Sequence, residues 1–82
     1  MNDEIKKQLE ETTGIAFDKY AQRHPTLGSY LKSNKATLLA SAISTVENDP
    51  EVTAAMQLAK TESDLQKVVE LIERLLPKLI NI

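Results

Sequence analysis

The sequence predicts an all-α fold, a compact bundle of about four helices in a single domain over residues 1–82. Apolar side chains recur at alternating steps of three and four residues, the spacing that places them on one face of a helix. Two places, Asp49 with Pro50 and Thr61, carry residue types that begin helices. No useful stretch alternates apolar and polar residues as a half-buried strand would. These three observations define the fold class.

The first helix is predicted over residues 3–23. Residues on its apolar line are Ile5, Leu9, Thr12, Ala16 and Tyr20. Gly14 lies inside this helix and costs about 1 kcal/mol relative to alanine. Because the apolar phase continues beyond Gly14, we expect one helix rather than two short ones. Pro25 then favours an extended conformation at His24, and the connection over residues 26–33 has room for a single helical turn.

The second and third helices, over residues 34–48 and 50–60, are predicted to form a central helical hairpin because the junction between them, at residues 47–49, is short. Ser33 or Asn34 is a suitable cap for the first of the two. Five of its residues are small: Ala36, Ala40, Ser41, Ser44 and Thr45. Since small side chains let a neighbouring helix approach closely, we expect this helix to lie in the middle of the bundle.

The last helix, predicted over residues 62–76, has the strongest periodicity. Its apolar positions are Leu65, Val68, Val69, Ile72, Leu75, Leu76, Leu79 and Ile82. Full burial of eight such side chains would supply at most about 16 kcal/mol of gross transfer free energy. Thr61 can cap this helix, with Asp64 completing a weak capping box. Pro77 removes a helical hydrogen bond, so the regular helix should end or kink near Leu76.

Composition argues against several classes of site. The chain has no cysteine, which excludes disulfides and thiolate metal sites, and it has one histidine. The usual zinc and di-iron constellations therefore cannot be built within one chain. Gly14 and Gly28 are isolated and form no phosphate-binding loop. We expect a non-enzymatic protein without metal or cofactor.

The start of the chain lacks the apolar core of a signal peptide, and no apolar run approaches the roughly 20 residues that cross a bilayer. We therefore expect a soluble, cytoplasmic protein. A chain of 82 residues buries only roughly 60–65% of its unfolded surface. A helical partner, often a second copy, would add to that burial.

Residues 17–35 hold every aromatic ring and the only histidine of the chain. From Lys19 to Lys35 there are four basic residues and no carboxylate, whereas residues 36–65 are mostly acidic where they are charged. Phe17 is expected to be buried. The residues predicted to contact a partner are Tyr20, Arg23, His24, Tyr30, Lys32 and Lys35. The alternative is that the three rings only fill the wide end of the bundle.

We expect an assembly, adaptor or inhibitory factor that acts by protein–protein association, with a homodimer as one form. Residues predicted to support self-association are Ile72, Leu75, Leu76, Leu79, Ile80 and Ile82. An alternative of equal weight is that this tail folds back onto its own chain. A second reading is a nucleic-acid-associated accessory protein that uses residues 17–35. The net charge of −2 makes nucleic acid the less favoured partner, and Glu70 and Glu73 weaken binding of the last helix to a membrane surface.

Overall fold

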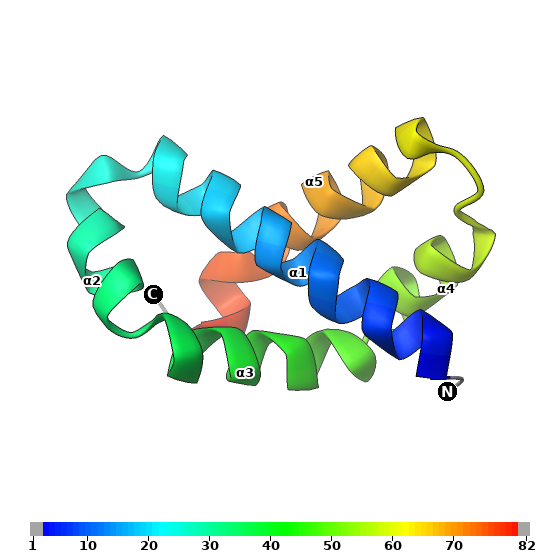
Figure 1. Cartoon of the computed structure of the whole chain (residues 1–82), viewed down its shortest axis with the longest axis horizontal. Coiled ribbons are helices and arrows are strands. Elements are labelled where there is room, and N and C mark those ends of the chain that lie inside the picture. Colours follow the sequence, from blue (N-terminus) through cyan, green and yellow to red (C-terminus); the bar gives the residue numbers. More distant parts are fainter. Residues whose placement is uncertain (1–2, 81–82) are drawn as a thin grey trace.

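Five α-helices and one 3₁₀ turn follow one another along residues 3–80, the part of the chain that the computed structural model describes (Figure 1). Their bounds are α1 Asp3–Arg23, η1 Pro25–Leu27, α2 Gly28–Ser33, α3 Lys35–Glu47, α4 Pro50–Leu58 and α5 Glu62–Leu79. Within residues 3–80 there is no strand, so the predicted all-α bundle is confirmed, with five helices instead of about four.

Helix α1 runs unbroken through Gly14 and contacts every other element, most extensively α5 and then α3. Its buried face includes Leu9, Ala16, Phe17 and Tyr20, largely the line predicted from the sequence. Thus α1 holds the middle position that the sequence analysis gave to residues 34–48. The small residues of α3 instead face solvent: Ala36, Ala40, Ser41, Ser44 and Thr45 are all exposed.

The predicted hairpin of α3 and α4 is present. The predicted side-chain cap forms at the start of α4 but not at the start of α3. The Asp49 carboxylate accepts hydrogen bonds from the backbone N–H groups of Glu51 (2.9 Å) and Val52 (3.2 Å), as predicted. Asn34 is the N-cap residue of α3 but makes no side-chain cap, because its Nδ2 donates to the carbonyl oxygen of Tyr30 at 2.9 Å. Helix α4 ends at Leu58, two residues before the predicted bound, where the chain becomes extended.

The helix that the sequence left as a possible turn is α2. Its one buried residue, Leu31, is completely enclosed, and this burial offsets the cost of ordering a helix of only six residues. Pro25 begins the preceding 3₁₀ turn, and η1 and α2 together close the end of the bundle that lies at the left of Figure 1.

Helix α5 begins with the predicted capping box, in which the Thr61 hydroxyl and the Asp64 carboxylate each accept the other residue's backbone N–H. Of the two alternatives predicted near Leu76, an end or a kink, the end is wrong, because α5 continues through Pro77 to Leu79. Leu76 and Ile80 are both buried, and the N–H of Ile80 donates to the carbonyl oxygen of Leu76 at 2.9 Å. Packing on both sides of the proline therefore holds the last turn.

The core consists of one cluster in which α1 and α5 contribute most of the buried apolar side chains. Residues from α2, α3 and α4 complete it: Leu31, Ala42, Val46, Val52 and Met56. In the described part of the chain, no helix has both the length and the apolar character that a membrane span requires.

Candidate binding cleft between α1 and α5

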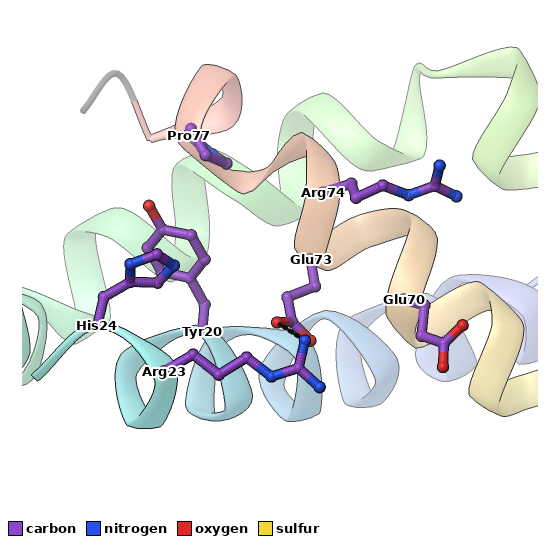
Figure 2. A pocket seen from close by; sticks show the side chains of 7 residues that line it. All are labelled: Tyr20, Arg23, His24, Glu70, Glu73, Arg74 and Pro77. Carbon is purple, nitrogen blue, oxygen red and sulfur yellow. Dashed lines mark ion pairs between the residues drawn. The ribbon is translucent and has the colours of Figure 1, made fainter.

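An open cleft of about 450 Å³ lies between the C-terminal end of α1 and the second half of α5 (Figure 2). The residues that line it are Tyr20, Arg23, His24, Glu70, Glu73, Arg74 and Pro77. Three of the six residues predicted to contact a partner therefore meet here.

Three of the residues that line the cleft come from the C-terminal end of α1. Tyr20, Arg23 and His24 are spaced i, i+3 and i+4, so they share one side of the helix. The N–H of His24 donates to the carbonyl oxygen of Tyr20 at 3.1 Å, the last helical bond before Pro25 ends α1. His24 then leaves the helical conformation, with φ −128° and ψ 69°, as expected for a residue before proline.

The opposite wall of the cleft comes from α5 by the same spacing. Glu70, Glu73, Arg74 and Pro77 are i, i+3, i+4 and i+7, a single side of that helix. Figure 2 shows Glu73 pointing toward Arg23, whereas Arg74 extends away from that pair. The inner part of the cleft therefore combines the side chain of Glu73 with the three residues of α1.

Glu73 is a buried carboxylate with an incomplete set of partners. The residue is only 8% exposed, and its Oε2 forms an ion pair with Nη1 of Arg23 at an N···O distance of 2.9 Å. Its other oxygen, Oε1, is buried and has no hydrogen-bond partner. The Arg23 side chain is 67% exposed. A buried charge needs both pairing and hydrogen bonds, and the single ion pair with an exposed guanidinium provides only part of this.

The sequence analysis missed Glu73, which it placed on the polar side of the last helix. In the structure Glu73 is one of the buried residues of α5. A signal was present in the sequence: Glu73 is four residues after Val69 and three before Leu76, both buried apolar positions. A carboxylate within such a stripe must be enclosed at least in part.

The rings of Tyr20 and His24 form the other feature of the cleft. Their centroids lie 4.2 Å apart at an interplanar angle of 34°, and Figure 2 shows them side by side. Tyr20 is buried, whereas His24 is exposed. The pair thus offers an imidazole face to solvent and fixes it against a ring that belongs to the core.

The other predicted contact residues lie elsewhere. Lys32 and Lys35 line a second cleft, of about 580 Å³, between α1 and α2, and Tyr30 lines neither cleft. Nζ of Lys35 donates to Oδ1 of Asp18 at 2.9 Å, with both side chains about half exposed. Tyr30 is 48% exposed on α2. The predicted contact surface is therefore divided between two sides of α1.

The residues predicted to support self-association are mostly used by the chain's own core. Ile72, Leu76 and Ile80 are buried, and Leu75 and Leu79 are half-buried against the same cluster. Ile82 lies outside the described residues. As far as Ile80, the tail folds back onto its own chain, which was one of the two alternatives from the sequence. Among the described residues of this predicted set, Leu75 and Leu79 are the ones that keep exposed surface for contact with a second copy.

Among residues 3–80, no three histidine, aspartate or glutamate side chains gather as a group that could hold a metal ion. Known protein families, curated proteins and solved structures include no significant match to this chain.

Proposed function

We propose that this chain is a non-enzymatic interaction protein that binds another protein, and that the cleft between α1 and α5 is its contact. The observation that supports this proposal is the buried Glu73 carboxylate, whose Oε1 has no donor at the base of an open cleft. Arginine and tyrosine, which are enriched where binding energy concentrates, lie beside it.

An unpaired buried acceptor is costly, by about 1–3 kcal/mol and more when the group is charged. A partner that donates an N–H to Oε1 recovers this free energy on binding. Because Oε1 is enclosed in the free chain, access requires a rotation of the exposed Arg23 side chain, and the donor of the partner then replaces the ion pair that this rotation gives up. The Arg23 guanidinium has further N–H donors for a carbonyl or carboxylate group of the same partner.

The ring pair gives the partner an apolar surface beside these polar groups. A rigid aromatic face next to an ion pair is an arrangement typical of an interface hot spot. A protein of this kind would serve as an adaptor, an assembly factor or an inhibitor, since its contribution is binding alone.

Affinity capture from the native host tests the proposal. Wild-type chain is compared with the cleft variants His24→Ala and Arg74→Ala, and with Lys32→Ala as a matched surface control in the other cleft. All three residues are exposed, so the fold should be kept, which circular dichroism checks. We expect the cleft variants to lose at least tenfold in affinity for the captured protein, about 1.4 kcal/mol, and the control to bind as wild type. Equal binding by all four chains contradicts the proposal.

A nucleic-acid-associated role is the second candidate. It is favoured by four basic side chains from α1, α2 and α5. None of them forms an ion pair within residues 3–80: Lys19, Lys32, Arg74 and Lys78. It is weakened because Arg23 and Lys35 are already paired with carboxylates, and because Tyr30 is the one half-exposed aromatic ring. Oligonucleotide binding that falls steeply with added salt would support it over protein association.

A further inference from the structure

The charges of the chain are separated along the longest axis of the molecule, which measures 34 Å. One end, here called the α2 end, comprises the second half of α1, η1, α2, the start of α3 and α5 from Glu70 onward. The other, called the α4 end, comprises the first half of α1, the last turn of α3, α4 and the start of α5. In Figure 1 these are the left and right ends.

The two ends carry opposite net charge. The α2 end has six of the ten basic residues and three of the twelve acidic ones, whereas the α4 end has the remaining four basic and nine acidic residues. Two of the cations at the α2 end, Arg23 and Lys35, are held by carboxylates of the same end. The excess positive charge therefore belongs to side chains free to meet another molecule.

Three large apolar side chains are exposed among the described residues: Ile15 in the second half of α1, Tyr30 on α2 and Leu58 on α4. Leu58, the last residue of α4, is 75% exposed, the highest value among the large apolar residues described. It borders a groove of about 290 Å³ between α4 and α5, whose lining combines apolar side chains such as Ala55 and Leu71 with two carboxylates and two cations: Glu51, Asp64, Lys67 and Arg74. Tyr30 on α2 is 48% exposed. A single exposed apolar residue is ordinary. Here, however, Leu58 lies at the end with net negative charge, and Tyr30 lies at the end with net positive charge.

We propose that the α2 end of one copy docks on the α4 end of a second copy, so that copies associate head to tail. This inference rests on the proposed function, because it makes a second copy one of the partners. The cleft between α1 and α5 belongs to the α2 end, but the contact tested here uses Tyr30 and Lys32 of α2, which do not line that cleft. Opposite charges steer and orient the two ends, and burial of Leu58 and Tyr30 supplies affinity. A two-fold contact through either end alone would oppose like charges, which disfavours that arrangement.

A head-to-tail contact leaves one free end of each kind on a pair of copies, so association continues into larger species. The test uses two double variants, one for each end. Tyr30→Ser with Lys32→Glu disables the α2 end, and Glu51→Lys with Leu58→Ser disables the α4 end. The four residues are exposed, and thermal unfolding by circular dichroism verifies that both variants fold.

Sedimentation velocity over a concentration series at low salt provides the readout. We expect the wild-type chain to grow beyond a dimer, and added salt to reverse this growth. Each double variant alone should remain monomeric. An equimolar mixture of the two should form a 1:1 complex and nothing larger, because one intact α2 end meets one intact α4 end.

Three results overturn the inference: a wild-type chain that stays monomeric or stops at a dimer, a double variant that still self-associates, or a mixture that does not pair. The cleft is untouched by these substitutions. A monomeric wild-type chain whose captured partner is lost in His24→Ala would therefore refute head-to-tail association and leave the proposed function standing.

Discussion

Two ion pairs of equal length show how surroundings decide the value of an interaction. Arg23–Glu73 and Lys35–Asp18 each have an N···O distance of 2.9 Å. The Glu73 side chain is 9% exposed, whereas those of Lys35 and Asp18 are 46% and 57% exposed. Solvent screens the second pair, so it contributes little to stability. Removal of Arg23 instead leaves a buried carboxylate without any donor.

We therefore expect Arg23→Ala to lower the free energy of unfolding by about 1–2 kcal/mol and Lys35→Ala to lower it by less than about 0.5 kcal/mol. Urea unfolding of the two variants measures both values. Glu73→Gln combined with Arg23→Ala should recover part of the loss, because the buried charge is then absent. Equal losses for the two single variants would show that burial of Glu73 does not matter.

For single residues, the sequence predicted burial and exposure correctly where a residue lies among side chains of similar polarity. Phe17 is buried, as predicted, and Arg23 and His24, which were predicted to contact a partner, are exposed. Glu73 was missed because a charged residue is assigned to the solvent side unless its partner is known. That partner, Arg23, is fifty residues away in the chain, and only the packing of α1 on α5 brings the two together.

Among the elements, α5 has the best-defined start. The Asp64 carboxylate accepts hydrogen bonds from the backbone N–H groups of Lys60 (3.0 Å) and Thr61 (3.3 Å), and the Thr61 hydroxyl accepts from Asp64 (3.1 Å). These bonds, the one from Lys60 first, lower the pKa of Asp64 below its ordinary value of 3.8. A lowered pKa means that the stabilisation is present above the unfolded-state value and is lost as the pH falls through the folded-state value.

Thr61→Ala should cost about 1 kcal/mol of stability and should raise the pKa of Asp64, because the Thr61 side chain is one of the groups that lower it. An NMR titration that follows the Asp64 carboxyl carbon measures the pKa in both chains. Ser63→Ala, a neighbouring exposed position outside the capping box, serves as the control. A wild-type midpoint at or above the ordinary value would contradict the proposed role of this box.

The starts of α4 and α5, and the end of α1 before Pro25, could be predicted because their causes are local. Asp49 and Thr61 cap the residues that follow them directly, so four or five residues of sequence contain the whole signal. The existence of α2 and the continuation of α5 past Pro77 depend instead on Leu31 and Ile80. Both are buried against other parts of the chain, and no local pattern records that contact.

The whole molecule is organised around the contact of α1 with α5, which provides both the core and the cleft. The sequence correctly identified the apolar face of the last helix as the surface on which the rest packs. It gave the middle position to residues 34–48 because of their small side chains, whereas α1 is the helix that contacts every other element. A single continuous core predicts that the chain unfolds in one cooperative transition.

The most direct test of this account is thermal unfolding followed by circular dichroism of Ile72→Asp, with Leu58→Asp as the matched control. Ile72 is completely buried between α1 and the other helices, whereas Leu58 is 75% exposed. We predict that Ile72→Asp abolishes the cooperative transition, because an unpaired charge then replaces a core side chain, and that Leu58→Asp unfolds cooperatively like wild type. A cooperative, undiminished melt of Ile72→Asp would contradict the claim that α5 supports the fold.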